Sequence, residues 1–266
     1  MAGRAHKLTH SRPLRILHTT SAVAAKGAHR LGPSITTIGL DADDTLWHNE
    51  RYFRLTQERF AEILSPHCRP DMLGSHLLDV ERRNLKRYGY GIKGFTLSMI
   101  ETAVEITQGR ISGTAIRQIL DAAHEMFDHP VEPLPHVTQA LGELAGRYRL
   151  VLITKGDLFD QERKLAASGL ADHFDAVEIV ADKTVRTYLD AFSRHGDGPE
   201  RALMAGNSLR SDIVPALEAG CWGVHVPHEF TWELEHAPAP VSHGRFREIS
   251  HLGELPQLAG QLAQSG

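Results

Sequence analysis

The second half of the chain alternates short apolar strands with helices, and this alternation limits the possible folds more than any other feature. Apolar runs occur at Leu150–Ile153, Ala176–Val180, Ala202–Ala205 and Trp222–Val226, with helical stretches between them. Strands that are apolar along their whole length are typical of a parallel sheet covered by helices on both faces. The pattern therefore predicts an α/β fold with a Rossmann-like parallel sheet.

The first half supplies one more strand and then a long region of helical character. Ile35–Leu40 is rich in β-branched residues and predicts the first strand of the same sheet. Residues 48–132 then predict four helices from apolar residues at helical spacing. These are Tyr52–Leu64, Met72–Leu85, a helix with Leu97, Ile100 and Val104 on one face, and a helix with Ile116, Ile119, Leu120, Ala123 and Phe127 on one face. We therefore expect a core of residues 35–47 and 133–266 and an all-helical insert of residues 48–132.

Composition narrows the class of protein. The 266 residues include 29 Lys and Arg against 33 Asp and Glu, a net charge of −4, whereas nucleic-acid-binding proteins are usually basic. No apolar run reaches the roughly 18 residues of a membrane-spanning helix. Two cysteines are too few for a disulfide framework, which favours a reducing compartment. We therefore expect a cytoplasmic protein that binds neither nucleic acid nor membrane.

The start of the chain differs in charge from the remainder. Residues 1–40 contain six basic residues and no acidic residue: Arg4, Lys7, Arg12, Arg15, Lys26 and Arg30. We predict that residues 1–34 form a basic, disordered extension. A targeting peptide and a mis-assigned start codon are the alternatives.

Polar residues gather where predicted strands end. Asp41–Thr45 follows the first strand, Thr154–Gly156 the second, Lys183 the third, and Gly206–Asp212 the fourth. In open α/β sheets, ligands bind beyond the carboxyl ends of the strands, so we expect these groups to form one site. Oxygen ligands alone favour a hard cation such as Mg²⁺, and a lysine with a helix N-terminus suits a phosphate.

These clusters resemble the motifs of one enzyme family. The segment Asp41–Leu46 reads DADDTL and resembles the D-x-D-x-T-L first motif of the haloacid dehalogenase superfamily of phosphohydrolases. Thr154 and Lys183 are similar to its second and third motifs, and Gly206–Asp212 to its fourth. The resemblance covers about residues 35–250, and the helical insert looks like the C1 cap of that superfamily. It implies a Mg²⁺-dependent phosphoric monoester hydrolase with the same core fold.

The resemblance also implies catalytic roles. Asp41 would be the nucleophile that forms an aspartyl-phosphate, and Asp43 the general acid and base. Mg²⁺ would be held by the Asp41 and Asp212 carboxylates and the Asp43 backbone carbonyl. Asn207, directly or through a water, would be a further ligand. It stands where the family usually has aspartate, so we expect weaker Mg²⁺ binding.

Further residues would bind the substrate. Thr154, with Lys155 and Gly156, would hold the phosphoryl oxygens, and Lys183 would offset the negative charge. Lys183 is followed by threonine rather than the proline common in the family, and Lys155 is the alternative for the third-motif lysine. In the helical insert, Tyr90 and Lys93 lie in and after a glycine-rich turn and are candidates for contact with the leaving group.

The predicted substrate is a small phosphomonoester, because a closed cap excludes large molecules. Three alternatives stay open: a phosphomutase on the same scaffold, a 2-haloacid dehalogenase, and a non-catalytic binding protein with this fold. Asp43 argues against the dehalogenase, because a halide leaves without needing a proton. The sequence leaves the oligomeric state open between monomer and homodimer.

Overall fold

The structure, a computed structural model, describes residues 34–264 and contains a six-stranded, all-parallel sheet. The basic extension predicted for residues 1–34 lies outside this range, apart from Ser34. The strand order is β3-β2-β1-β4-β5-β6. The strands are β1 Thr37–Leu40, β2 Arg149–Lys155, β3 Ala176–Val180, β4 Ala202–Gly206, β5 Trp222–His225 and β6 Phe246–Glu248. The sheet confirms the predicted Rossmann-like α/β core.

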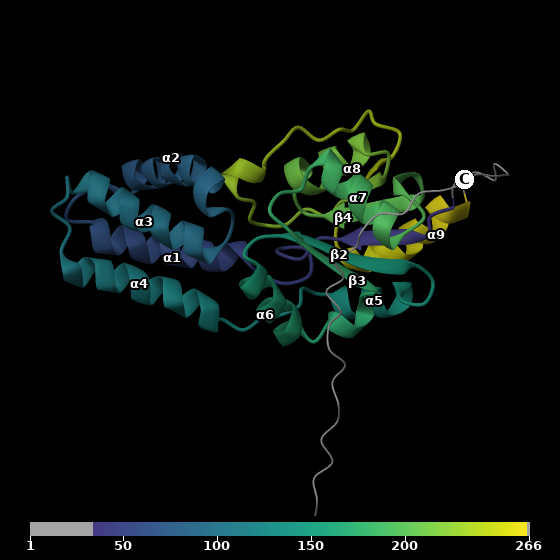
Figure 1. Ribbon diagram of the computed structural model, residues 1–266, viewed down its shortest axis with the longest axis horizontal. Helices are drawn as coiled ribbons and strands as arrows, with labels where there is room; N and C mark the ends of the chain where they lie inside the picture. The colour runs from purple at the N-terminus through teal and green to yellow at the C-terminus, as the bar shows by residue number, and fades with distance from the viewer. Residues whose placement is uncertain (1–33, 265–266) are drawn as a thin grey trace, which may run out of the picture. The chain divides into compact units, whose positions relative to one another are not determined.

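Helices cover both faces of the sheet, because the strands are apolar on both sides (Figure 1). In β2, Leu150 and Leu152 face one helical layer, while Val151 and Ile153 face the other. The first layer contains α5 (Val137–Leu144), α6 (Leu158–Ser168) and α9 (Leu255–Gln264). The second contains α7 (Val185–His195) and α8 (Val214–Glu218), which a π-helical turn at Leu209–Ile213 precedes. Of these helices, α5, α7 and α9 have no counterpart in the sequence prediction, and neither does strand β6.

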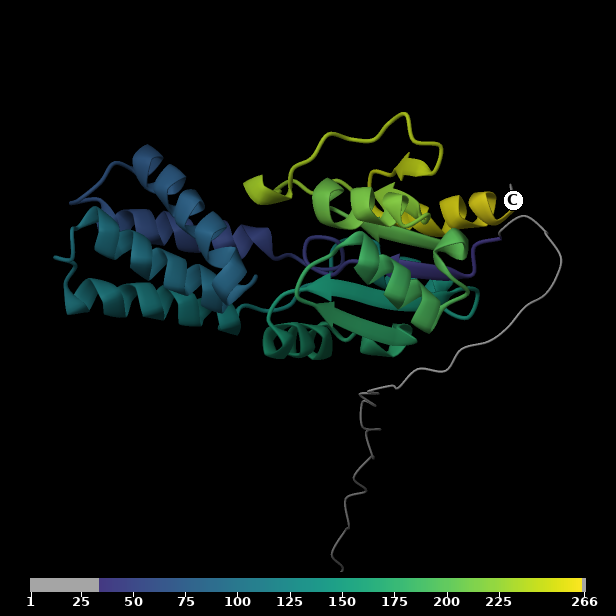
Figure 2. The same ribbon diagram turned by 45° about the horizontal axis from the view of Figure 1, so that its top comes forward.

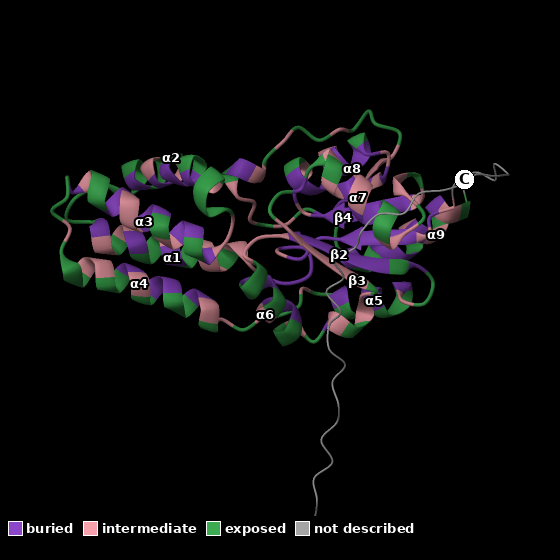
Figure 3. Ribbon diagram, in the orientation of Figure 1, coloured by how far each residue is buried: buried purple, intermediate pink, exposed green. Residues whose placement is uncertain are grey.

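Of the five helices between β1 and β2, the first four lie together beyond one end of the sheet (Figure 2). They are α1 Glu50–Leu64, α2 Pro70–Tyr88, α3 Ile92–Ile106 and α4 Gly113–Asp128. We call them the helical segment. Its apolar core includes Phe60, Leu77, Met99 and Ile119 and is separate from the two cores beside the sheet. Buried positions accordingly run along the inner faces of these helices (Figure 3).

One predicted helix face is wrong. Leu97 and Val104 of α3 are 43% and 41% exposed, whereas Phe95 and Met99 are buried in the helical segment. The helix has apolar residues at helical spacing on two faces, so periodicity alone does not identify the packed one.

The chain passes between the sheet and the helical segment twice, at adjacent places. The backbone of Trp47 pairs with that of Pro133, and the His48 N–H donates to the Glu132 carbonyl at 3.4 Å. Trp47 is fully buried at this crossing. Within the described residues, no helix combines the length and apolar character needed to cross a membrane.

Candidate active site

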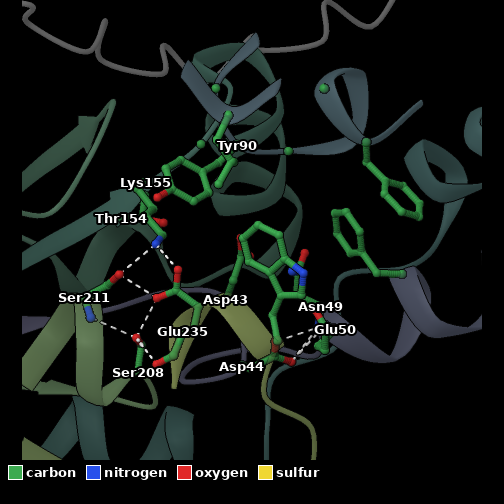
Figure 4. Close-up of a pocket in the computed structure, with 18 of the residues that line it drawn as sticks. Asp43, Asp44, Asn49, Glu50, Tyr90, Thr154, Lys155, Ser208, Ser211 and Glu235 are labelled. Atoms are coloured by element: carbon green, nitrogen blue, oxygen red, sulfur yellow. Dashed lines mark hydrogen bonds and ion pairs between the residues drawn. The ribbon is translucent and has the colours of Figure 1, made fainter. Parts of the chain in front are cut away.

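The predicted polar clusters meet around one cavity of about 150 Å³. Parallel register brings the ends of β1, β2 and β4 together, since Leu40 pairs with both Leu152 and Ala205. Residues of α1, α2 and α3 in the helical segment also line the cavity. Its lining includes the predicted site residues Asp41, Asp43, Tyr90, Thr154, Lys155, Gly156, Lys183, Asn207 and Asp212. Figure 4 labels Asp43, Tyr90, Thr154 and Lys155 among them.

Two buried carboxylates share one buried lysine at the base of this cavity. Lys183 donates to Asp41 Oδ1 in a short contact and to Asp212 Oδ1 at 2.7 Å. All three side chains are at least nine-tenths buried. Burial, together with the Asp212 charge, raises the pKa of Asp41 to about 7 despite the Lys183 ammonium. One cation therefore does not neutralise the two carboxylates, and the group attracts further positive charge.

Backbone geometry fixes Asp212. The Ser208 N–H donates to Asp212 Oδ2 at 2.9 Å, at the start of the π-helical turn. Gly206 makes room for the carboxylate, because a Cβ at that position would lie 2.3 Å from Asp212 Oδ2. The glycine of the predicted fourth motif therefore has a steric reason in this chain.

Thr45 joins the first and fourth motifs. Its hydroxyl lies 3.0 Å from Asp41 Oδ2 and 3.3 Å from Asn207 Oδ1, and it accepts from the Asn207 N–H at 3.0 Å. The sequence reading included Thr45 in the motif but gave it no role. Here it orients one oxygen of Asp41, while Lys183 orients the other.

The Asp43 carboxylate is held by three donors. Oδ1 accepts from Trp47 Nε1 at 2.8 Å and Lys164 Nζ at 2.6 Å, and Oδ2 accepts from Gln161 Nε2 at 2.8 Å. Burial acts to raise the pKa of Asp43, but the Lys164 charge and the three hydrogen bonds outweigh it and lower that pKa. In this arrangement Asp43 is a carboxylate, which can accept a proton and has none to give.

Lys164 and Gln161 are absent from the sequence reading. Both lie on α6, whose cavity-facing side is polar, while Leu158 and Phe159 of the same helix are exposed. The usual rule that the polar face of a helix is exposed therefore does not identify Gln161 and Lys164 as site residues. Their position could have indicated them, because both residues lie on the helix that directly follows the second motif.

Thr154 offers an unused hydrogen-bonding group. It is 1% exposed, and its hydroxyl has no hydrogen-bond partner among the described residues. Buried polar groups are nearly always paired, so an unpaired hydroxyl at a cavity indicates a ligand position. Next to it, Gly156 has a φ of 145°, and a Cβ there would lie 2.8 Å from Gln161 Nε2. The backbone therefore approaches the cavity closely after β2.

Lys155 belongs to a second polar network along the cavity. Its ammonium lies 4.0 Å from the centre of the Tyr90 ring, donates to Ser211 Oγ at 2.7 Å and pairs with Glu235. Glu235 also accepts from the hydroxyls of Ser208 and Ser211 (Figure 4). The network brings Tyr90 of the helical segment against the sheet end, and Glu235 and the two serines are additions to the predicted site.

Lys93 lies apart from the cavity lining. It is largely exposed and pairs with Asp157 at 2.9 Å, at the N-terminus of α6. Asp157 caps that helix by accepting from the Asp160 N–H at 3.1 Å. Of the two residues predicted to contact the leaving group, the structure thus brings Tyr90 to the cavity and places Lys93 beside it.

The sequence of residues 35–220 matches the haloacid dehalogenase-like hydrolase family. The chain belongs to this family. A solved haloacid dehalogenase-like hydrolase from Xanthomonas campestris is 43% identical, covers 90% of this chain and 96% of its own, and superposes with a TM-score of 0.78.

Curated relatives of this haloacid dehalogenase-like hydrolase are phosphatases. A glyceraldehyde 3-phosphate phosphatase from Methanothermobacter thermautotrophicus is 35% identical over 74% of this chain and 88% of its own. A pyrimidine 5′-nucleotidase from Escherichia coli is 26% identical over 59% of this chain and 72% of its own. The chain is therefore an enzyme, a phosphatase-type hydrolase of the family.

The family generally uses Mg²⁺, and the donor set of this chain fits a hard cation. Asp41 and Asp212 offer carboxylate oxygens, and Asn207 lines the same cavity with an amide oxygen. Burial first, and then the Asp212 charge, raises the pKa of Asp41, and a bound cation would favour its ionised form. Among the described residues no three His, Cys, Asp or Glu side chains cluster as a metal site, so backbone or water oxygens would complete the coordination.

Proposed function

We propose that this hydrolase is a Mg²⁺-dependent phosphatase that cleaves a small phosphomonoester through an aspartyl-phosphate on Asp41. The observation that carries the proposal is the buried group of Asp41, Lys183 and Asp212 at the base of the cavity. The unpaired hydroxyl of Thr154 at the same cavity supports a phosphoryl group beside it.

In the first step, an Asp41 oxygen attacks phosphorus, and the bond between phosphorus and the leaving oxygen breaks. Thr45 and Lys183 each hold one oxygen of Asp41, which limits its rotation before attack. Lys183 and the Thr154 hydroxyl stabilise charge on the phosphoryl oxygens. Mg²⁺, held by Asp41, Asp212, the Asp43 carbonyl and Asn207, would supply further charge neutralisation.

Asp43 acts as the general acid and the general base in this mechanism. It gives one to the leaving oxygen and later takes one from the water that hydrolyses the acyl-phosphate, which restores Asp41 and releases phosphate. A carboxylate bound to Lys164 and Gln161 cannot act as an acid. We therefore infer that Asp43 leaves these donors and takes up a proton when the substrate is bound.

The helical segment serves as the cap in this proposal. The cavity draws its lining from both the sheet ends and α1–α3, so a substrate has to fit between them. This enclosure favours small phosphate esters such as sugar phosphates, phosphorylated aldehydes or nucleoside monophosphates. The names of the curated relatives support the same range.

The test is phosphate release from a panel of small phosphomonoesters, with Mg²⁺ and with a chelator. Asp41→Asn should abolish release, because an amide cannot form the acyl-phosphate. Asp121→Asn is the matched control, since Asp121 is exposed on α4 and distant in sequence from every motif. Wild-type turnover in Asp41→Asn, or turnover that is unaffected by the chelator, would contradict the proposal.

A further inference from the structure

The cavity continues past the catalytic group, toward the helical segment, and the character of its lining changes there. Aromatic residues form part of the wall, with Phe53 and Phe95 in contact at 5.1 Å between ring centres and Tyr90 near Trp232 at 6.2 Å. Polar residues complete it, and two of them are glutamates: Glu50, the first residue of α1, and Glu81 of α2. If the proposed function holds, this region receives the leaving group.

The positively charged side chains in the described lining of the cavity are all paired with carboxylates. Among the described residues of the lining, the cations are three lysines, and each one contacts a carboxylate of the same cavity. The pairs are Lys155 with Glu235, Lys164 with Asp43, and Lys183 with Asp41 and Asp212. In the described lining, no cation is left unpaired to bind a carboxylate or a second phosphate on the leaving group.

The two glutamates, by contrast, have few hydrogen-bond donors around them. Within the described part of the chain, no side chain donates a hydrogen bond to the Glu50 carboxyl. Burial, and next the Asp44 charge, raises the pKa of Glu50 to about 8. Glu81 is 8% exposed, and burial raises its pKa to about 7 against a hydrogen bond from Trp232. A ligand with donor groups would relieve the desolvation of both carboxyls.

A third acceptor faces the same cavity. Gln161 is 4% exposed and lines it, and its Oε1 atom has no hydrogen-bond partner among the described residues. Its Nε2 group is already used by Asp43 and the Lys155 carbonyl. A buried amide oxygen left in this state requires a donor from a ligand or water.

We propose that the leaving group is neutral or cationic and rich in hydroxyl or ammonium donors, and that Glu50 and Glu81 select against anionic leaving groups. At a pH where Glu50 and Glu81 are ionised, an anion would enter beside two carboxylates, and every lysine in the described lining is already paired. A polyol or an amino alcohol would give these acceptors the donors they lack, while its carbon skeleton packs on the aromatic rings.

The first experiment compares matched esters on the wild-type enzyme. At pH 9, where Glu50 and Glu81 are ionised, glucitol 6-phosphate is paired with 6-phosphogluconate, and phosphoethanolamine with phosphoglycolate, so that each pair differs chiefly in the charge of the leaving group. We expect kcat/KM to favour the neutral or cationic member at least about tenfold, which corresponds to roughly 1.4 kcal/mol. Equal values, or preference for the anionic members, would overturn this inference and leave the proposed function standing.

The second experiment assigns the preference to residues. At pH 9, above the raised pKa values of both residues, Glu50→Gln, Glu81→Gln and the double variant each remove negative charge while keeping the side-chain length. We expect the KM of the anionic esters to fall about tenfold in the double variant, with little change in kcat. Glu58→Gln is the control, because Glu58 is an exposed residue of α1 outside the cavity lining.

Each outcome separates the two proposals. An equal fall in KM with Glu58→Gln would assign the effect to net charge and overturn the roles of Glu50 and Glu81. Circular dichroism confirms that the variants are folded, and the wild-type comparison needs no variant. Absence of turnover on all four esters and on the wider panel would overturn the proposed function and this inference with it.

Discussion

Replacing Lys164 with methionine tests whether the ion pair to Asp43 is the contact that sets the state of that carboxylate. The Lys164 ammonium lies 2.6 Å from Asp43 Oδ1, and the two side chains are 9% and 23% exposed. Lys164 also lies 3.2 Å from Asn49 Oδ1 and 3.7 Å from Asp160 Oδ2. Methionine keeps the length and the apolar stem while removing the charge.

The expected loss follows from the geometry. Coulomb attraction across this distance is about 6 kcal/mol at an effective dielectric constant near 20, and desolvation of both groups offsets much of it. Hydrogen bonds to charged groups contribute about 1.5–3 kcal/mol net. We therefore expect Lys164→Met to lower the free energy of unfolding by about 2–3 kcal/mol at pH 7. At about 2–4 °C per kcal/mol, the melting temperature should fall by roughly 5–10 °C.

The lowered pKa of Asp43 determines how the stability loss in Lys164→Met depends on pH. The pKa of Asp43 is lowered in the folded state, so its contribution is present above the ordinary value of 3.8 and is lost as the pH falls through the lowered value. The cost of Lys164→Met should therefore be full at pH 7 and shrink as the pH approaches and passes below 4. Urea unfolding of wild type and variant across this range measures both.

A double-mutant cycle isolates the pair. Urea unfolding of Lys164→Met, Asp43→Asn and the double variant at pH 7 should give a coupling energy of about 2 kcal/mol. If Lys164→Met costs as much in the Asp43→Asn background as in wild type, the loss comes from Asn49, Asp160 or packing, and the reasoning about Asp43 is refuted.

Three further predictions concern the site and the helical segment. Lys183→Met leaves Asp41 and Asp212 buried without their cation, so urea unfolding should show a loss of about 3–5 kcal/mol, and turnover should fall at least about 100-fold. Gly206→Ala displaces the Asp212 carboxylate, so half-maximal phosphate release should need at least about tenfold more Mg²⁺. Ile119→Ala opens a cavity in the fully buried core of the helical segment and should cost about 2–5 kcal/mol in urea unfolding.

Each of these three variants has a result that would contradict its prediction, and the Gly206 variant has a matched control. Gly142→Ala is matched to the Gly206 variant, because outside its own helix no atom of the described residues lies within 4 Å of a Cβ at that position. An unchanged Mg²⁺ requirement in Gly206→Ala would contradict the role of Asp212. Wild-type turnover in Lys183→Met would remove Lys183 from the catalytic group. A loss below about 1 kcal/mol for Ile119→Ala would mean that the helical core can collapse around the smaller residue.

The core of the fold and the base of the site were predictable because both depend on local patterns. Apolar strands that alternate with helices predict a parallel sheet. In such a sheet the polar residues at the carboxyl ends of the strands lie close together, as Asp41, Thr154 and Asp212 do. The helical insert was predictable from spacing, although the packed face of α3 was not. The oligomeric state, the cytoplasmic location and the nature of residues 1–34 stay predictions.

The remainder of the site depends on geometry that the sequence does not encode locally. Glu50, Glu81 and Trp232 reach the cavity from three separate elements, and their meeting depends on how the helical segment is set against the sheet. On α6, polar side chains face inward because the cavity is polar, which reverses the usual rule for a surface helix. Gln161 and Lys164 are therefore found only once the cavity is known.

The paired crossing between sheet and helical segment also has a consequence for the order of folding. Thr37 of β1 must pair with Arg149 of β2, so a long stretch of chain separates two neighbouring strands, and contacts of this kind form slowly. The helical segment has mostly local contacts and its own core, and its two ends emerge side by side where Trp47 pairs with Pro133. Early folding of α1–α4 would therefore bring β1 and β2 within reach of each other and reduce the entropy lost when they pair. The insert that encloses the cavity would then also act as the template that starts the sheet.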